Sequence, residues 1–339
     1  MTSHSSAARE PLITRSRLHE LLDAARGRRV AIVGDAMLDV YVRGDVERIS
    51  PEAPVPVVRV RETSYGLGGA ANVAQNIAAA GSACALVAVV GDDASGRTLR
   101  GELAKVQGEV TSLVQVGRPT TQKTRVLARA QQIVRFDEED DGDLDGGDVD
   151  RLLGAVAGAV ENADALVLED YNKGVLVPRV IEGAIRLARS RRIPIVVDPK
   201  YRNFFLYAGA TIFKPNRREL ADALGAEIEL EHPEALPATF NRLGVDNLLL
   251  TLGERGMVLV SSGGQIKSEP TMAREVYDVV GAGDTVTAYL ALTLAAGGTP
   301  AEAAVIANYA AGVEVGKPGA ATVSADEVLA AYDAYVAPA

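Results

Sequence analysis

Short apolar runs that alternate with helical patterns constrain the fold of this chain more than any other feature of its sequence. The runs are rich in Val, Ile, Leu and Ala, as expected for strands that are buried on both faces of a sheet. They lie at residues 29–35, 84–93, 165–170, 193–199, 210–216 and 247–253. Helical patterns lie between several of them, as in 70–81 and 180–192. This alternation predicts an α/β fold with a mostly parallel central sheet and helices on both faces.

Two segments, 41–66 and 118–137, interrupt this alternation with short β patterns rich in Val, Arg and Thr. Their prolines suit edge strands, so we expect a small β lid rather than an extension of the central sheet. A lid over the carboxyl ends of the strands, where such sheets bind ligands, would exclude water during a reaction. No repeat or long linker is visible, which predicts a tail and helix at 1–28 and a single lid-bearing domain at 29–330.

Composition excludes several classes of function. The 339 residues carry a formal charge of -10 with no long basic run, which argues against nucleic acid or an anionic membrane as a partner. One cysteine, Cys84, and three scattered histidines offer neither a disulfide framework nor a zinc site. The sequence has no signal-peptide pattern and no 18-residue apolar span, so we expect a cytoplasmic protein.

The stretch YDVVGAGDTV at 277–286 leads into a predicted helix. The unpaired N–H groups and the positive dipole at a helix start favour an anion, and glycines let it approach the backbone. A carboxylate would repel a phosphate but can accept a proton. We therefore interpret Gly281, Ala282 and Gly283 as an anion hole for a transferred phosphoryl group, and Asp284 as the base for an attacking hydroxyl. The alternative is a tight turn in which Asp284 only caps the helix.

Three further patterns support phosphoryl transfer. A glycine-rich turn at 66–81 enters a helix and offers contacts to sugar hydroxyls. The segment 214–220 follows a buried strand and is suited to hydrated Mg²⁺ and phosphates, while 248–260 resembles a hairpin whose turn could border a nucleotide. The candidate residues are Gly68, Gly69 and Asn72 for the sugar, and Asn216 and Glu219 for the metal, bound through water.

Basic residues in QKTRVLAR could hold the phosphate of a sugar phosphate. Strand alternation places Lys123, Arg125 and Arg129 on one face. The alternative is a solvated basic edge that discourages aggregation. Lys173 and Arg135 are further candidates with the same two interpretations.

The motifs GGAANVAQN, KPNRRE and DVVGAGD together resemble the PfkB, or ribokinase-like, carbohydrate kinases, over about residues 29–325. The resemblance implies a ribokinase-like three-layer fold, a kinase that uses ATP and Mg²⁺, Asp284 as the base, and Asn216 with Glu219 as the metal and phosphate motif. It implies nucleotide contacts at Lys200, Thr251, Gly253, Gly256 and Asn308, although Tyr201 departs from the family pattern after Lys200.

Longer stretches are similar to one branch of that family, the kinases of D-glycero-β-D-manno-heptose 7-phosphate. They include QQIVRFDEE, DYNKG, VDPK and EVYDVVGAGDT. This resemblance implies phosphorylation of the anomeric C1 hydroxyl to the 1,7-bisphosphate, on the route to lipopolysaccharide heptose, with sugar contacts at Asp35 and Asp39. Asp137 and the strand-end Asp170 are further sugar-contact candidates. The branch is often fused to a nucleotidyltransferase with a His-x-Gly-His motif, which this sequence lacks, so we expect adenylylation by a separate protein.

Several alternatives remain at this stage. The sequence GLGGAA fits a loose dinucleotide-binding pattern but lies far from the first strand, and no Walker A pattern is present. The acidic segment 137–148 lacks the final Glu of an EF-hand and favours a solvated loop that caps the next helix. Another sugar or nucleoside kinase, or a non-catalytic sugar sensor of the same fold, stays open. We also expect a homodimer through the lid edges, and a monovalent cation near Asp278 is a further possibility.

Overall fold

The structure is a computed structural model and describes residues 13–106, 109–129, 131–225 and 236–336. Most of the predicted N-terminal tail therefore lies outside the described residues. The central sheet of the described chain has nine strands in the order β13-β12-β11-β10-β9-β8-β1-β4-β5. The strands of this sheet are β1 (Arg29–Gly34), β4 (Ala83–Val90), β5 (Glu109–Gln115), β8 (Ala165–Glu169), β9 (Ile195–Asp198), β10 (Ile212–Phe213), β11 (Asn247–Thr251), β12 (Met257–Ser261) and β13 (Ile266–Glu269).

Strand direction confirms the prediction of a mostly parallel sheet. All pairings from β5 to β11 are parallel, and β12 and β13 add an antiparallel edge. Successive residues of β1 point to opposite faces, so that Val30 and Ile32 belong to one hydrophobic core and Ala31 and Val33 to the other. The sheet thus separates two cores, which is why the strands β1, β4 and β8 at its centre are apolar over nearly their whole length.

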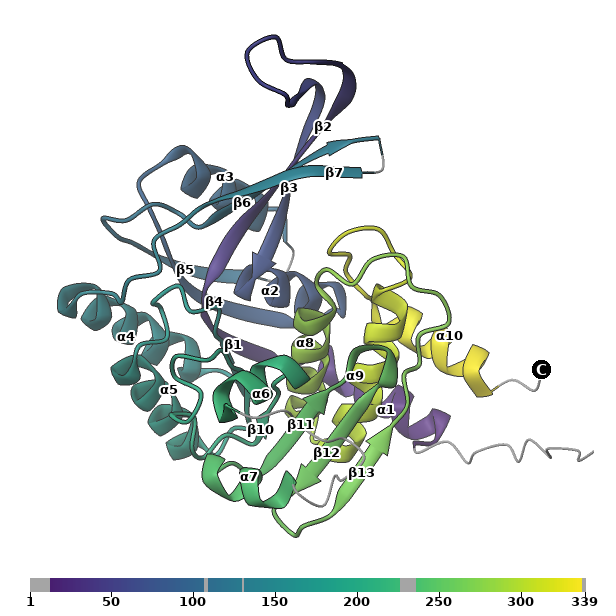
Figure 1. The fold of residues 1–339 in the computed structure, drawn as a ribbon. Coiled ribbons are helices and arrows are strands. Elements are labelled where there is room, and N and C mark those ends of the chain that lie inside the picture. The colour runs from purple at the N-terminus through teal and green to yellow at the C-terminus, as the bar shows by residue number, and fades with distance from the viewer. Residues whose placement is uncertain (1–12, 107–108, 130, 226–235, 337–339) are drawn as a thin grey trace, which may run out of the picture.

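Helices cover both faces of the sheet (Figure 1). One core contains side chains of α1 (Arg15–Ala25), α2 (Ala70–Ala79), α8 (Ala282–Ala295), α9 (Pro300–Glu314) and α10 (Ala325–Val336). The other contains side chains of α4 (Gly146–Glu161), α5 (Pro178–Arg191), α6 (Arg217–Leu224) and α7 (Leu236–Leu243). No helix in the described part of the chain is long and apolar enough to cross a membrane.

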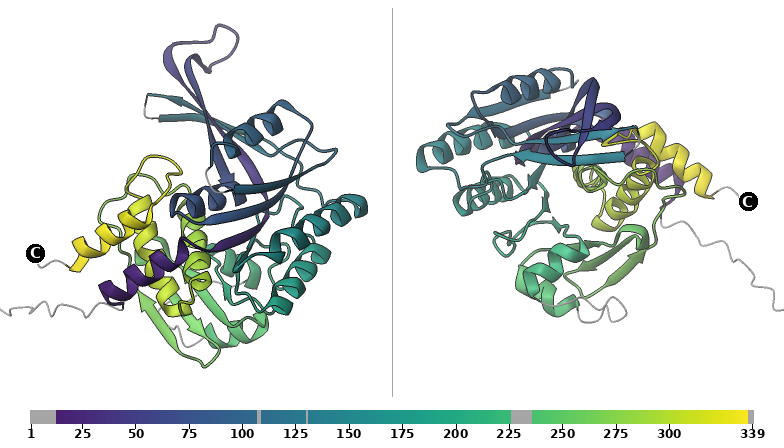
Figure 2. Two further views of the ribbon diagram at one scale, coloured as in Figure 1. Left: turned by 180° about the vertical axis from the view of Figure 1, so that it is seen from behind. Right: turned by 45° about the horizontal axis from the view of Figure 1, so that its top comes forward.

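A second sheet of four strands projects from the central one (Figures 1 and 2). Its order is β3-β2-β6-β7, with bounds β2 (Ala36–Ile49), β3 (Pro56–Gly69), β6 (Gln122–Ala128) and β7 (Gln131–Glu138). The strands β2 and β3 extend beyond the predicted segment 41–66, because the apolar residues after Asp35 continue the backbone pairing down to the Ala36–Gly69 pair. We call this sheet the lid. The acidic segment 137–148 leads into α4, and Asp145 caps that helix as expected.

One buried acid in the core has no counterpart in the sequence analysis. Glu314 is the last residue of α9 and is completely buried, and neither of its carboxylate oxygens has a hydrogen-bond partner among the described residues. Burial, followed by repulsion from Asp278 and Asp284, raises the pKa of Glu314 to about 8. The negative end of the helix dipole acts in the same direction. Glu314 therefore favours its neutral form in the folded protein.

Glu314→Gln tests this assignment. The folded-state pKa lies above the unfolded value, so the wild type loses stability as pH rises from the unfolded value of about 4.5 through 8. The variant lacks this loss. We therefore expect the melting temperature of the variant, relative to that of the wild type, to rise between pH 5 and pH 9. Differential scanning calorimetry across that range measures the gain. Glu302→Gln is the control: the hydrogen bond from Arg17 lowers the pKa of Glu302, so its difference from the wild type should stay constant there. A constant difference for Glu314→Gln would contradict the assignment.

Candidate active site

Asp284 lies in the first turn of α8 and is buried. The N-cap of this helix is Gly281, whose φ of 96° is in the left-handed region that favours glycine. The Asp284 side chain does not cap the helix, because its two oxygens accept bonds from elsewhere. Asn72 Nδ2 donates to Oδ2 over 2.7 Å, and the Tyr171 hydroxyl donates to Oδ1 over 2.8 Å. The capping alternative is therefore wrong, and the carboxylate is free of the helix backbone.

Burial raises the pKa of Asp284 to about 6, against the hydrogen bonds from Asn72 and Tyr171, which lower it. The nearby Asp198 carboxylate adds to the increase and Lys214 opposes it. A carboxyl group with this pKa is ionised near neutral pH and is a stronger proton acceptor than an exposed aspartate. Asp284 thus has the properties of a general base.

Two cavities meet at Asp284. The large cavity has a volume of about 910 Å³, and the small cavity has a volume of about 320 Å³. Tyr171, Gly281 and Asp284 line both. The predicted nucleotide-side residues gather in the large cavity, namely Lys200, Asn216, Glu219, Thr251, Gly253, Gly256 and Asn308, together with Ala282 and Gly283. The small cavity is lined by the predicted sugar-side residues Asp39, Gly68, Gly69, Asn72, Lys123 and Arg125, and by Arg135.

The cations of the small cavity are paired with carboxylates. Arg125 forms an ion pair with Asp39, and Lys123 lies 3.1 Å from Asp137. Arg135 donates to the same Asp137 carboxylate, and this bond, with that from Lys123, holds the pKa of Asp137 well below its usual range. Asp137 is therefore a partner of the cations and does not line the cavity itself.

Arg129 does not join this cluster. The strand β6 ends at Ala128, a register shift interrupts its pairing between Val126 and Leu127, and Arg129 has a φ of 55° in the turn that follows. Its side chain is exposed. The prediction from strand alternation is wrong at this position because the strand is irregular and ends before it.

Asp35 and Asp170 are likewise not sugar contacts in this structure. The Asp35 carboxylate accepts three backbone N–H groups, from Tyr171, Lys173 and Val175. Asp170 accepts the N–H of Asn172 and the hydroxyl of Tyr207, each over 2.7 Å. Both carboxylates hold the loop that follows β8, and neither lines the large or the small cavity.

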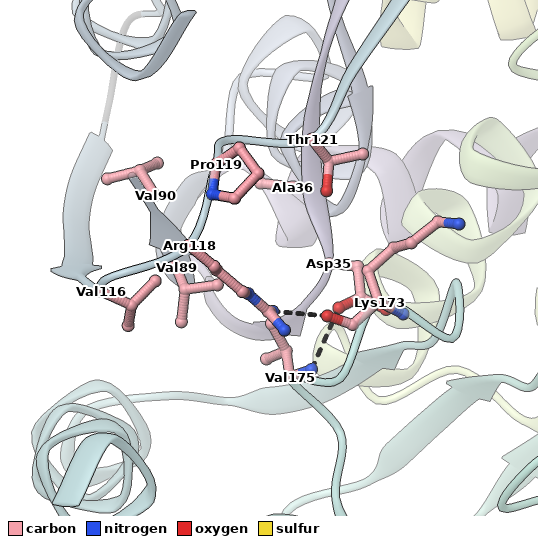
Figure 3. Close-up of a pocket in the computed structure, with 10 residues that line it drawn as sticks. All are labelled: Asp35, Ala36, Val89, Val90, Val116, Arg118, Pro119, Thr121, Lys173 and Val175. Atoms are coloured by element: carbon pink, nitrogen blue, oxygen red, sulfur yellow. Dashed lines mark hydrogen bonds between the residues drawn. The ribbon is translucent and has the colours of Figure 1, made fainter. Parts of the chain in front are cut away.

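The cavity beside Asp35 has a volume of only about 10 Å³, too small for a sugar (Figure 3). Arg118 lines it and donates to the carbonyl of Lys173. Figure 3 shows the Lys173 side chain extending away from Arg118, and its ammonium group lies 2.7 Å from Glu139. Lys173 lines this cavity and not the small one, which corrects its predicted position.

Asn216 and Glu219 form a capping box at the start of α6. Asn216 Oδ1 accepts the N–H of Glu219, and Glu219 Oε2 accepts the N–H of Asn216, each over 2.8 Å. The other Glu219 oxygen pairs with Lys200. The pair thus has a structural role that the sequence analysis did not include. Asp278, next to the glycine stretch, accepts N–H groups from Val280 and Gly319 and so joins two loops.

A buried charge cluster behind Asp284 was not predicted from the sequence. Carboxylate oxygens of Glu169, Asp198 and Asp284 lie within 4.8 Å of one another, and Lys214 Nζ lies 2.9 Å from Asp198. Tyr171 was missed as well. Glu169 and Asp198 end buried strands, whereas Tyr171 and Lys214 stand within two residues of such an end. The available signals were this position at the sheet edge and, for Tyr171, Asp198 and Lys214, their place in the motifs DYNKG, VDPK and KPNRRE.

The chain matches known proteins over most of its length. The family model described as pfkB family carbohydrate kinase matches residues 28–327. The chain is 47% identical over 318 residues to the bifunctional protein HldE of Rhodospirillum rubrum, covering 93% of this chain and 64% of that protein. It is 45% identical over 318 residues to HldE of a Caulobacter species, covering 92% and 64%. The chain therefore spans about 64% of the length of these curated relatives.

Solved structures show the same fold at lower identity. Arabidopsis thaliana ribokinase, complexed with ribose and ATP, has a TM-score of 0.69 and 21% identity, with 90% of this chain and 98% of that chain covered. Phosphofructokinase-2 from Escherichia coli, in complex with potassium, has a TM-score of 0.77 and 22% identity, with 91% and 99% covered. These likenesses confirm the ribokinase-like fold.

The buried Lys214–Asp198 pair should be critical for stability. Lys214→Met would leave three buried carboxylates without this cation, and we expect it to lower the free energy of unfolding by about 3–5 kcal/mol. The matched control is Lys105→Met, which breaks an ion pair in which the lysine side chain is 69% exposed. Exposed pairs contribute less than about 1 kcal/mol. Urea unfolding of both variants measures the difference, and equal losses would contradict the importance of the buried pair.

Proposed function

Since the chain belongs to the pfkB family of carbohydrate kinases, we propose that it transfers a phosphoryl group from ATP to the anomeric C1 hydroxyl of D-glycero-β-D-manno-heptose 7-phosphate. The product is the 1,7-bisphosphate, a precursor of lipopolysaccharide heptose. The observation that carries this proposal is the position of Asp284 where a cavity with several cations meets a larger one. The motifs of the heptose 7-phosphate kinase branch support this choice of sugar. ATP as donor fits the cytoplasmic location that the sequence predicts.

The sugar phosphate would occupy the small cavity. Its lining has three cations, Lys123, Arg125 and Arg135, and two carboxylates, Asp39 and Asp284. A phosphate can compete with Asp39 and Asp137 for these cations, because its oxygens accept the same charge-assisted hydrogen bonds. Asn72 and the backbone at Gly68 and Gly69 remain for the sugar hydroxyls. The 7-phosphate and the C1 hydroxyl would then lie toward opposite ends of the cavity.

ATP would occupy the large cavity, whose volume of about 910 Å³ is sufficient for a nucleotide. The cavity has an apolar wall for the adenine ring, formed by Val276, Val279 and Val315. A Cβ at Gly283 would lie 3.7 Å from Lys214 Nζ, at ordinary contact distance, so the start of α8 lies beside this cation. The phosphates can therefore approach the start of α8 and Lys214 together.

Asn216 and Glu219 line the large cavity and are the residues that would hold Mg²⁺ through water. An amide oxygen and a carboxylate are the hard oxygen ligands that Mg²⁺ prefers, and their engagement in the capping box fits indirect binding through water. When bound, the ion neutralises charge on the phosphates. A monovalent cation near Asp278 stays part of the proposal.

In the reaction, the oxygen of the C1 hydroxyl attacks the γ-phosphorus in line, and Asp284 accepts the proton that this hydroxyl loses. The bond between the γ-phosphorus and the β,γ-bridging oxygen breaks, and the electron pair leaves with ADP. The N–H groups of Gly281 and Gly283 at the start of α8 would stabilise the negative charge of the transferred group, whereas the N–H of Ala282 donates to the Val279 carbonyl over 3.4 Å. An anomeric hydroxyl is more acidic than an ordinary alcohol, so a carboxylate whose pKa is about 6 is an adequate base.

The lid also supports a homodimer. Its strands β3 and β7 are open edges, and it carries apolar side chains that are half exposed or more, such as Ile49, Val60 and Phe136. A second lid would cover both features. Sedimentation equilibrium measures the state, and a monomer at micromolar concentration would contradict this part of the proposal.

The base and the substrate can be tested in one assay. We expect coupled ADP release with ATP·Mg²⁺ and heptose 7-phosphate, and little with ribose, fructose 1-phosphate or adenosine. Asp284→Asn should lower kcat by about 10²–10⁴-fold, with little change in KM for ATP. Asp145→Asn is the matched control, because asparagine caps α4 as well as aspartate does. Preference for another sugar would reject the heptose assignment, and turnover that survives Asp284→Asn would reject the base.

The position of the phosphate clamp can be tested with two arginines of the lid. Arg135→Gln removes a cation from the small cavity, and we expect KM for the sugar phosphate to rise by about 10- to 100-fold, because a charge-assisted hydrogen bond is lost. Arg129→Gln makes the same change just beyond β6 and should leave this KM within about twofold. KM for ATP is measured in parallel and should not change. Equal effects of the two substitutions would mean that the lid attracts the substrate only through its general charge.

A further inference from the structure

Tyr171 contacts the base but has no role in the reaction described above. We propose that Tyr171 is a positioning residue for Asp284, whose hydroxyl fixes the carboxylate in the orientation that receives the proton of the sugar. This inference rests on the proposed role of Asp284 as the base. It concerns a residue that lines both cavities, between the sites proposed for the sugar and for ATP.

The geometry around the carboxylate supports this role. The Tyr171 hydroxyl donates to Oδ1 and the Asn72 amide to Oδ2, so each oxygen of Asp284 has one donor. Two donors on different oxygens fix the rotation of the carboxylate plane, and each oxygen keeps a lone pair for another proton. Asn72 comes from α2 and Tyr171 from the loop after β8, so the base is held from two different elements.

Several contacts fix the position of Tyr171 in its loop. Its N–H donates to the buried Asp35, and the adjacent Asp170 is fixed by the hydroxyl of Tyr207. Asn172 has a φ of 55°, a conformation that costs energy outside glycine. Lys200 Nζ lies 4.8 Å from the centroid of the Tyr171 ring. Two buried carboxylates and a strained residue thus serve to place one side chain.

The chemistry of the phenol limits it to this role. Burial, followed by the negative charge of Asp284, raises the pKa of Tyr171 well above its ordinary value, so the side chain stays neutral. Its single proton is donated to Asp284, and Tyr171 does not accept the proton of the sugar. A hydrogen bond donated to a carboxylate stabilises the ionised form, which is the form that acts as a base.

The test compares Tyr171→Phe with Tyr332→Phe. Both substitutions remove one hydroxyl that donates a hydrogen bond over 2.8 Å, but Tyr171 donates to Asp284 whereas Tyr332 of α10 donates to the carbonyl of Ile13. We expect Tyr171→Phe to lower kcat by about tenfold and to move the acidic limb of its pH profile upward by about one unit, because the ionised base loses a donor. KM for ATP should stay within about twofold. Tyr332→Phe should leave the acidic limb in place.

Other charged groups near Asp284 are the same in both variants, so they do not account for a difference between the acidic limbs of the two pH profiles. Those that act on Asp284 from neighbouring elements are Glu169 of β8, Asp198 of β9, Lys214 after β10 and Glu314 of α9. None is altered in either variant, and the ionisation of the sugar phosphate is common to all the enzymes compared. Thermal unfolding of both variants establishes that they are folded at the assay temperature.

An unshifted acidic limb in Tyr171→Phe, with kcat within about twofold of the wild type, would overturn the positioning role. Equal shifts in the two variants would also overturn it, because they would indicate an effect that does not depend on the bond to Asp284. Asp284→Asn separates this failure from failure of the proposed function. If Asp284→Asn loses activity while Tyr171→Phe behaves as the wild type, the base stands and only the positioning role is rejected. If Asp284→Asn remains active, the base itself is rejected.

Discussion

The burial of an ionisable carboxylate at the start of α8 is the constraint on which the rest of the structure depends. Asp284 is 4% exposed, and Glu169 and Asp198 are buried beside it. Taking charges out of water is costly unless cations and hydrogen bonds compensate for the lost hydration. Lys214 supplies the charge, and Asn72 and Tyr171 supply the hydrogen bonds. A parallel sheet suits this task because the ends of its strands bring such groups to one edge.

The loops at that edge are organised by the same principle. Asp35 and Asp170 follow neighbouring strands, and their carboxylates accept N–H groups of the loop after β8. Each bond satisfies a backbone group that would otherwise be buried without a partner. The loop in turn presents Tyr171 to Asp284. Acidic residues at this edge therefore fall into two groups, those that face the cavities and those that hold the residues that do.

The sequence was sufficient for the fold, because the central sheet depends on local patterns. Apolar runs identified that sheet, and a glycine-rich helix start pointed to Asp284, whereas most predicted residues of the large cavity followed from the resemblance to a family. What could not be predicted depends on tertiary contacts. Asp35 has the same local pattern as a ligand contact, but three N–H groups distant in sequence occupy it. The prediction that Arg129 joins the basic cluster fails because the sequence does not show that the strand is irregular and ends before it. Tyr171 was missed because its partner, Asp284, is 113 residues away.

The connections of the lid determine how it can move. Only Asp35 separates β1 from β2, and β3 is followed directly by α2, so these two connections contain no flexible linker. The lid thus continues the central domain without a hinge at these two connections, so any movement of it there would bend and twist paired strands. Stiffness is then a property of the whole β2–β3 ribbon. Substitutions along its length, far from either cavity, would alter the resistance of the ribbon to bending, and Asp35 at its root would carry that strain to the loop that holds Tyr171.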